Sequence, residues 1–182
     1  MRGHLVLIGG GARSGKSAFA LVRARELGAR RVFVATAQAL DAEMRERVAA
    51  HRAERGDDFR TVEEPLELAA TLRGLEDSAD VVLIDCLTLW LANLLLRGDS
   101  EDAIAARVDE LAATLASASF ASVVVTNEVG MGIVPENELA RAFRDVTGRA
   151  HQRLARDADE IHFAALGVLL RLRPTPIEVR TP

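Results

Sequence analysis

One segment, GGARSGKS at residues 10–17, restricts the folds open to this chain more than any other. It fits the phosphate-loop pattern G-x-x-x-x-G-K-[ST], with Gly10, Gly15, Lys16 and Ser17 at the fixed positions. A short apolar run over residues 4–9 precedes the segment, and a helical pattern over residues 16–27 follows it. Because a phosphate loop needs this strand–loop–helix setting, the sequence predicts a nucleotide-binding α/β domain.

Lys16 is the only lysine of the chain, beside 22 arginines. A compact ammonium group on a flexible stem reaches between β- and γ-phosphates, which a wide planar guanidinium does less well. A lysine placed at random among the 23 basic positions would fall here about once in 23 trials. Composition therefore supports the motif independently of its pattern.

The expected phosphate loop comprises Gly10, Gly11, Ala12, Arg13, Ser14, Gly15, Lys16 and Ser17. Its backbone N–H groups should surround phosphates, and the dipole of the following helix should add positive charge at the same point. The glycines allow close approach to the phosphates, and the Ser17 hydroxyl should bind Mg²⁺. The alternative is a chance match in a glycine-rich turn, which the strand–loop–helix setting disfavours.

Asp85 ends the apolar run VVLID over residues 81–85. Phosphate-loop proteins hold Mg²⁺ through water with an acidic residue at the end of another strand, and Asp85 fits that role. It could equally cap the helix that we expect to start near Leu87. The two roles are compatible, and we favour the metal role.

Bulk composition excludes several classes of protein. The 182 residues fit one domain, residues 1–182, and 49% hydrophobic with 27% charged residues is typical of a globular protein. A net charge of −4, no tyrosine, one tryptophan and no basic stripe argue against a nucleic-acid partner. Cys86 is the only cysteine, so no internal disulfide is possible and a reducing compartment is expected. We expect no signal peptide, because the first strand starts within a few residues of the N-terminus. We expect no transmembrane segment, because the longest apolar run, 86–96, is too short to span a bilayer. A cytoplasmic protein is therefore expected.

Apolar runs alternate with helical patterns along the whole chain, which predicts an α/β fold with a mostly parallel sheet flanked by helices. The expected strands are 4–9, 31–36, 59–63, 81–85, 122–126, 160–164 and 168–172. The expected helices are 16–27, 41–55, 66–72, 87–96, 101–116 and 138–156. The tail 173–182 carries three prolines and is expected to be irregular.

His51 is the one histidine whose setting suggests chemistry. On the expected helix 41–55 it shares a stripe with Met44, Val48 and Arg55, and Arg47 and Arg52 flank it. A neutral imidazole among guanidinium groups can attack a phosphate that the arginines hold. By residue type alone, a surface histidine is the commoner outcome.

The remaining histidines point to structure. His4 and His162 lie at or in expected strands, where packing is the default, and His151 lies in a polar helix and should be solvated. The lysine count adds a constraint on His51. Enzymes that carry a nucleotide on lysine need one outside the phosphate loop, so covalent transfer here would need another carrier, and histidine is the natural one.

Four segments together resemble a known family over nearly the whole chain and in the right order: GGARSGKS, VATAQALDAEMRERVAAHRAER, FRTVEEP and NEVGMGIVPENELARAFRDVTGRAHQRLARDADEI. The family is the bifunctional adenosylcobinamide kinase/adenosylcobinamide-phosphate guanylyltransferase of cobalamin (vitamin B12) biosynthesis. The segment NEVGMGIVPEN is far more specific than a phosphate loop. The resemblance implies a RecA-like P-loop NTPase fold and a ring-like homotrimer.

The resemblance implies two reactions. The first phosphorylates the aminopropanol hydroxyl of adenosylcobinamide with ATP or GTP. The second transfers GMP from GTP to that phosphate, which gives adenosyl-GDP-cobinamide and pyrophosphate. In this family the transfer passes through a guanylylated histidine in an H-x-x-x-R segment, which falls on His51 and Arg55.

The resemblance also implies the nucleotide-contacting positions. Besides the loop Gly10–Ser17 and Asp85, they are Ala35, Thr36, Ala37, Arg52, Ala53, Glu54, Arg55 and Glu63. Three positions depart from the family pattern, which often has Lys at Arg52, and Pro and Trp where this chain has Gly56 and Phe59.

Other interpretations remain open. A P-loop small-molecule kinase without nucleotidyl transfer would leave His51 idle, and a nucleotide-dependent switch or assembly ATPase would bind partners instead of converting a metabolite. In the loop 127–137, Asn127 and Glu128 could orient the acceptor hydroxyl or contact Mg²⁺, or the loop could be turn chemistry only. The apolar helix with Trp90 is expected to serve the core or a subunit interface, not corrinoid binding.

Overall fold

The structure is a computed structural model that describes residues 3–38, 56–174 and 178–180. The expected helix 41–55 lies outside these residues, and with it the candidate site residues His51, Arg52, Ala53, Glu54 and Arg55.

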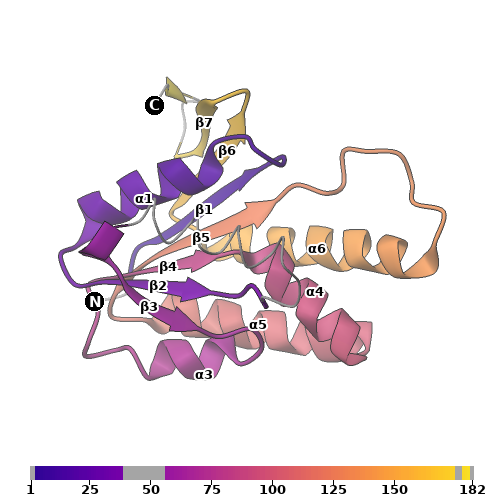
Figure 1. Cartoon of the computed structure of the whole chain (residues 1–182), viewed down its shortest axis with the longest axis horizontal. Helices are drawn as coiled ribbons and strands as arrows, with labels where there is room; N and C mark the ends of the chain where they lie inside the picture. Colours follow the sequence, from indigo (N-terminus) through magenta and orange to yellow (C-terminus); the bar gives the residue numbers. More distant parts are fainter. Residues whose placement is uncertain (1–2, 39–55, 175–177, 181–182) are drawn as a thin grey trace.

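An eight-stranded sheet runs through the molecule in the order β3-β2-β4-β5-β1-β6-β7-β8 (Figure 1). The first six strands of that order pair in parallel, and the last two add antiparallel pairs at one end. In chain order the strands are β1 Leu5–Gly10, β2 Arg31–Ala35, β3 Arg60–Glu63, β4 Val81–Asp85, β5 Ala121–Asn127, β6 Glu160–Ala165, β7 Val168–Arg173 and β8 Glu178–Arg180.

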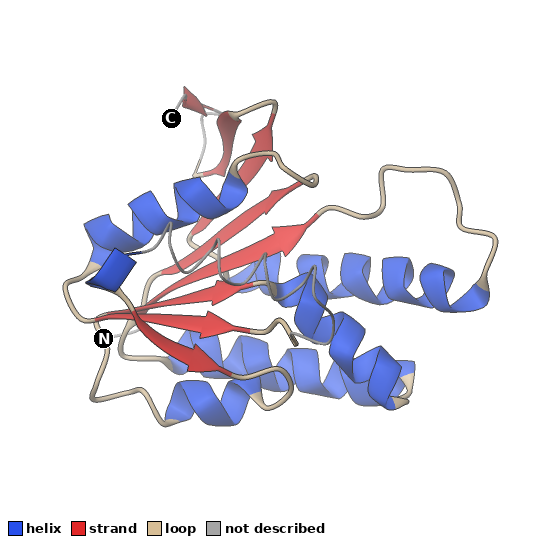
Figure 2. Cartoon of the chain, in the orientation of Figure 1, coloured by secondary structure: helices blue, strands red, loops and turns tan. Residues whose placement is uncertain are grey.

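Helices cover both faces of this sheet (Figures 1 and 2). Helix α1 lies on one face, whereas α3, α4, α5 and α6 lie on the other. Their bounds are α1 Lys16–Leu27, α3 Leu68–Arg73, α4 Leu87–Arg97, α5 Glu101–Ser117 and α6 Glu138–Asp157, with a short 3₁₀ helix η1 at Gly56–Asp58.

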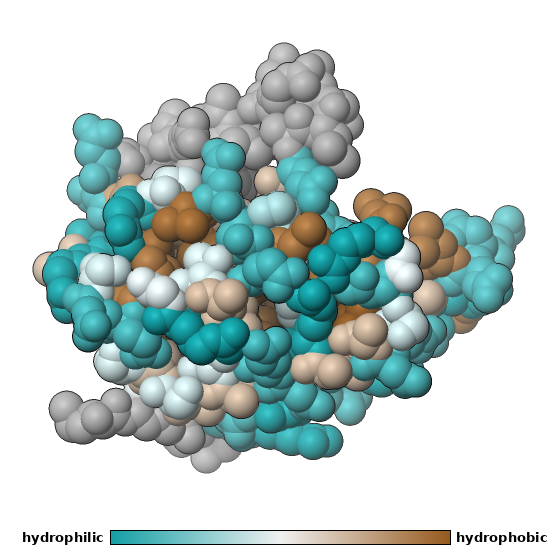
Figure 3. All heavy atoms as spheres, turned by 90° about the horizontal axis from the view of Figure 1, so that it is seen from below, coloured by the Kyte–Doolittle hydropathy of each residue, from teal (hydrophilic) through white to brown (hydrophobic). Residues whose placement is uncertain are grey.

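The two layers explain why the central strands read as continuous apolar runs. In β1, Leu5 and Leu7 join the core under α3–α6, whereas Val6 and Ile8 join the core under α1. Because successive side chains point to opposite faces, a strand covered on both faces must be apolar throughout. On the face seen in Figure 3, small areas of apolar side chains are separated by hydrophilic ones.

The sequence predictions agree with these elements to within two residues at nearly every boundary. The tail is the exception, since residues 178–180 form β8 and pair antiparallel with β7. The expectation of an irregular tail is therefore wrong over these three residues. The free edge of β7 presents unpaired backbone groups, which even a short extended segment can satisfy.

Helix α4 belongs to the core, as expected from its apolar sequence. Trp90 is 2% exposed, and its ring N–H donates to the Leu66 carbonyl oxygen at 2.8 Å. Cys86 is a free, buried thiol just before the helix. Across the described ranges, no helix combines the length and apolarity needed to cross a membrane.

A polar cluster ties β1, α1 and β6 together at the amino ends of the strands. The Glu160 carboxylate contacts His4 at 2.7 Å and His162 at 2.9 Å, and it also accepts hydrogen bonds from Arg23. Burial raises the pKa of Glu160, but the hydrogen bonds from Arg23, His162 and His4 outweigh it and bring the pKa to about 2. His162 is buried and His4 half-exposed, as expected for histidines packed in or beside strands.

The Glu160 cluster should stabilise the fold in a pH-dependent way. Because folding lowers the pKa of Glu160 from 4.5 to about 2, its contribution is complete above pH 4.5 and is lost as the pH falls through 2. We expect Glu160→Gln to lower the free energy of unfolding by about 2 kcal/mol at pH 7. Urea denaturation at pH 7 and pH 3 should show that difference shrink at the lower pH.

Glu26→Gln is the matched control, since Glu26 binds the same Arg23 from an exposed position. We expect it to cost less than about 0.5 kcal/mol at both pH values. An equal loss in Glu160→Gln at pH 7 and pH 3 would contradict the role assigned to the carboxylate.

Candidate functional site

The phosphate loop leaves the carboxyl end of β1 and needs glycine at two points. A side chain at Gly10 would place its Cβ 2.4 Å from the Ala164 carbonyl oxygen, which is too close for any atom. Gly15 is the N-cap of α1 with φ at +92°, in the left-handed region that glycine adopts without strain. Both glycines that define the motif therefore have a steric reason in this chain.

The start of α1 is built to receive an anion. Its first turn contains no acidic residue, and its N-cap offers no side chain to bond the free N–H groups. Lys16 is only 8% exposed, and its Nζ donates to the Gly11 carbonyl oxygen at 3.0 Å, which folds the side chain over the loop. The Ser14 hydroxyl is buried with no hydrogen-bond partner in the described part of the chain. A phosphate is the ligand that such a helix terminus favours.

The parallel register brings other predicted site residues to the same edge of the sheet. Ala35 is level with Glu63 on one side and with Asp85 on the other. Gly10 is level with Asn127, and β5 separates β1 from β4. The carboxyl ends of parallel strands are where ligands bind in folds of this kind.

Asp85 lies half-buried at this edge, one strand removed from the phosphate loop. The residue that caps α4 is Cys86, in extended conformation, so the helix-capping alternative for Asp85 is not supported. Its carboxylate remains a candidate to hold a metal ion, and so does the hydroxyl of Ser17, which is half-buried at the start of α1.

Thr36 fastens the end of β2 to the end of β4. Its hydroxyl donates to the Cys86 carbonyl oxygen and accepts from the Cys86 N–H, both at 2.8 Å, and Thr36 is completely buried. These bonds fix the backbone immediately after Asp85. Ala35 and Ala37, on either side of Thr36, are half-buried at the edge.

Asn93 is a residue of this edge to which none of the sequence motifs points. Its Nδ2 donates to the Thr36 carbonyl oxygen at 2.8 Å and to the Pro65 carbonyl oxygen at 3.0 Å. It therefore joins α4 to the segments that follow both β2 and β3. The one carboxamide in the apolar helix sequence LTLWLANLLL indicates such a contact, because a polar group on an apolar helix needs a hydrogen-bond partner when it is buried.

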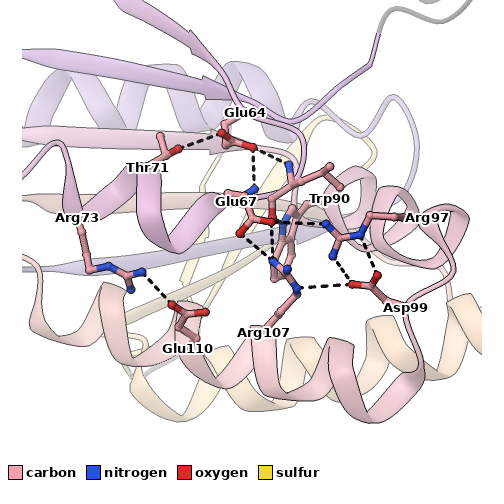
Figure 4. A network of polar contacts seen from close by, with 10 residues as sticks. Glu64, Glu67, Thr71, Arg73, Trp90, Arg97, Asp99, Arg107 and Glu110 are labelled. Atoms are coloured by element: carbon pink, nitrogen blue, oxygen red, sulfur yellow. Dashed lines mark hydrogen bonds and ion pairs between the residues drawn. The ribbon is translucent and has the colours of Figure 1, made fainter.

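The segment that follows Glu63 is fixed by a dense polar network (Figure 4). The Glu64 carboxylate accepts hydrogen bonds from two backbone N–H groups that follow it in the chain and from the Thr71 hydroxyl. Glu67 then meets Arg107 of α5 and Arg97 of α4, and the hydrogen bond from Arg107 is the main cause that lowers the pKa of Glu67. Glu63 thus ends β3 as an exposed carboxylate on a well-supported segment.

His151 is not the solvated residue that its polar helix predicts. Its side chain is 18% exposed, and its Nε2 lies 2.6 Å from the hydroxyl oxygen of Thr126, near the end of β5. Its Nδ1 lies 3.8 Å from a carboxylate oxygen of Glu128. The expectation of a solvated histidine is wrong because α6 packs this part of its surface against the end of β5 (Figure 1).

Asn127 and Glu128 continue β5 beyond the level of Gly10 and play different parts. The Asn127 side chain donates to the Thr88 hydroxyl at 2.9 Å, so it ties β5 to the first turn of α4. The Glu128 N–H donates to the Gly10 carbonyl oxygen at 3.0 Å, so its backbone is bound to the start of the phosphate loop. The Asn127 side chain and the Glu128 backbone therefore bind the start of the loop 127–137 to α4 and to β1.

The structure thus brings together most of the predicted site. The phosphate loop, Ala35–Ala37 and Asp85 lie along one edge, and Glu63 lies on the same edge but on the outermost strand. His51 and residues 52–55 lie outside the described residues, so their place is not part of this geometry.

A solved structure shares this fold. It is an ATPase domain that matches 97% of this chain and 79% of its own, with a TM-score of 0.54 and 15% sequence identity. The fold is therefore that of a RecA-like P-loop NTPase, as predicted.

Sequence comparison identifies the family. Residues 6–172 match the model of "Cobinamide kinase / cobinamide phosphate guanyltransferase". The "Bifunctional adenosylcobalamin biosynthesis protein CobP" of Pseudomonas aeruginosa is 44% identical over 94% of this chain and 98% of its own length. The "Bifunctional adenosylcobalamin biosynthesis protein CobU" of Escherichia coli is 38% identical over 93% of this chain and 99% of its own. The phosphate loop and the sheet edge described above therefore belong to a transferase of the cobinamide kinase/cobinamide phosphate guanyltransferase family.

Proposed function

We propose that this enzyme phosphorylates the aminopropanol hydroxyl of adenosylcobinamide with ATP or GTP and then transfers GMP from GTP to the new phosphate. The products would be adenosyl-GDP-cobinamide and pyrophosphate. The observation that carries the proposal is the anion site at the start of α1, in a chain similar over nearly its full length to relatives named as bifunctional.

Mg²⁺ fits the oxygen donors at this edge. Ser17 would offer a hydroxyl, and Asp85 would hold the ion through water. Among the described residues no group of three or more His, Cys, Asp or Glu could hold a metal ion, so phosphates and water would supply most ligands. Bound there, Mg²⁺ would neutralise charge on the phosphate oxygens.

His51 would carry the guanylyl group. Its nitrogen would attack the α-phosphorus of GTP, the bond from that phosphorus to the bridging oxygen would break, and pyrophosphate would leave with the electron pair. The phosphate of adenosylcobinamide phosphate would then attack the same phosphorus and release the histidine. The H-x-x-x-R spacing to Arg55 and the lack of a lysine outside the phosphate loop support this assignment.

The nucleotide-contacting roles of Ala35–Ala37, Glu63 and residues 52–55 are part of the same proposal. So are a homotrimeric assembly and a cytoplasmic location, which rest on the resemblance to the family.

The covalent step can be tested with GTP labelled at the α-phosphate. We expect label to stay on the protein, to survive alkali and to be released by acid, because a phosphoramidate behaves in this way. His51→Ala should abolish the label and the guanylyl transfer but retain the kinase activity. His4→Ala, which removes a histidine at the opposite edge of the sheet, should keep the label.

Absence of label from the wild-type protein, with kinase activity present, would favour a kinase without nucleotidyl transfer. Nucleotide hydrolysis without either product would favour a switch or assembly ATPase. Parallel loss of both activities in a folded His51→Ala protein would contradict a dedicated nucleophile.

Lys16 should serve both reactions, and its shape should matter beyond its charge. We expect Lys16→Ala to lower kcat/KM of both reactions by at least about 100-fold, the effect of removing one charged group that stabilises the transition state. Lys16→Arg keeps the charge but should recover less than about a tenth of the activity, because a planar guanidinium does not replace the ammonium. Steady-state kinetics with each acceptor supplied separately would measure both; a fully active Lys16→Arg enzyme would show that charge alone suffices.

A further inference from the structure

Three side chains near the end of β5 form a cluster that the proposed function leaves unused. They are Thr126 in the strand, Glu128 just after it and His151 from α6. Thr126 Oγ1 contacts His151 Nε2, and His151 Nδ1 lies toward the Glu128 carboxylate. Thr126 is buried, His151 is mostly buried, and Glu128 is 27% exposed. Glu128 is the most exposed of the three, so its carboxylate is the group of this cluster that is most open to a ligand.

The protonation of His151 follows from its surroundings. Burial lowers the pKa of His151, with only a partial opposing effect from Glu128, so the ring is neutral near pH 7. A neutral imidazole has one N–H donor and one acceptor nitrogen. The favourable tautomer has Nε2 accepting from the Thr126 hydroxyl and Nδ1–H facing the Glu128 carboxylate, because the other would turn a lone pair toward that charge.

Glu128 is held on its other sides as well. Its carboxylate accepts a hydrogen bond from the Gly130 N–H, and its own N–H donates to the Gly10 carbonyl oxygen at 3.0 Å. The carboxylate is therefore held by the Gly130 amide, with the His151 imidazole 3.8 Å away, on backbone bound to the first residue of the phosphate loop. Such support from neighbouring groups is what a catalytic side chain needs to keep its geometry.

The two proposed reactions place different demands on a base. In the first, an alcohol oxygen attacks the γ-phosphorus, and its proton must go to an acceptor. In the second, the attacking oxygen belongs to a phosphate, which carries no proton on that oxygen at neutral pH. A general base is needed in the first reaction only.

We propose that Glu128 is the general base of the phosphoryl transfer and that His151 is its positioning residue; this inference rests on the proposed function. The acceptor oxygen forms a bond to the γ-phosphorus while its proton passes to the Glu128 carboxylate. The bond from that phosphorus to the β–γ bridging oxygen breaks, and the nucleoside diphosphate leaves with the electron pair. The proton then returns to solvent.

The other carboxylates that end strands at this edge in the described structure fit the role less well. Glu63 lies on β3, and β2, β4 and β5 separate that strand from the one that carries the phosphate loop. Asp85 lies on β4 and is the candidate for the metal ion. Glu128, by contrast, is bonded directly to the loop that would hold the phosphates.

The test supplies each acceptor separately to purified full-length protein. We expect Glu128→Gln to lower kcat for adenosylcobinamide phosphorylation by about 100-fold or more, with KM for the nucleotide changed less than about threefold. Guanylyl transfer to supplied adenosylcobinamide phosphate should stay within about threefold of the wild-type rate. Glu136→Gln makes the same change at an exposed position of the same loop and should leave both rates unchanged.

Two substitutions of His151 separate positioning from packing. His151→Asn keeps an N–H near the place of Nδ1, facing Glu128, whereas His151→Gln keeps only a group near Nε2, facing Thr126. We expect the kinase kcat to fall about 10-fold in His151→Gln and less in His151→Asn, with guanylyl transfer retained in both. Equal loss of both activities in both variants would show a structural role only.

The outcomes distinguish this inference from the function on which it rests. Wild-type protein that forms no adenosylcobinamide phosphate would overturn the proposed function and the base with it. Active wild-type protein with an equally active Glu128→Gln variant would overturn the base alone. Loss of both reactions in a folded Glu128→Gln protein would also overturn it, since a shared nucleotide or metal role would then explain the residue.

Discussion

The parallel pairing of β1 with β5 decides where the groups of the candidate site lie, because it fixes which residues leave their strands together. Gly10 is level with Asn127, and the next backbone N–H, that of Glu128, bonds to Gly10. A slip of one residue would turn the Thr126 side chain to the other face of the sheet and away from His151. The phosphate loop and the Thr126–Glu128–His151 cluster therefore depend on one register.

The side chains that hold this edge together are distinct from those that face a ligand. Thr36 and Asn127 are both committed to partners around the first turn of α4, and Asn93 joins that helix to the ends of β2 and β3. Thr36 is completely buried, and leaving its hydroxyl without a partner would cost about 1–3 kcal/mol. Helix α4 thus acts as the common support of the edge, which accounts for polar residues in an otherwise apolar segment.

Sequence patterns were sufficient for elements whose signals are local. Strands β1 and β4 are apolar runs that end in the glycines of the motif and in Asp85, and both appear where expected. Contacts made across the fold were harder to predict. The mostly polar sequence of its helix predicts a solvated His151, although this residue adjoins the buried stripe of Val146, Ala150 and Leu154. That stripe shows which side of α6 is buried, but the partner of the buried side follows only from the position of β5 in the sheet.

Two transfers that differ in nucleophile can share one phosphate loop if their leaving groups are alike. Phosphoryl transfer would release a nucleoside diphosphate, and guanylyl transfer would release pyrophosphate; both leaving groups contain the β-phosphate of the bound nucleotide. A cation at that phosphate, the role proposed for Lys16, would therefore stabilise both transition states. The nucleophile differs between the two reactions. In phosphoryl transfer it is an alcohol, which needs a base, and in guanylyl transfer it is a histidine, which does not. The proposed roles of Glu128 and His51 follow that division, with Lys16 common to both.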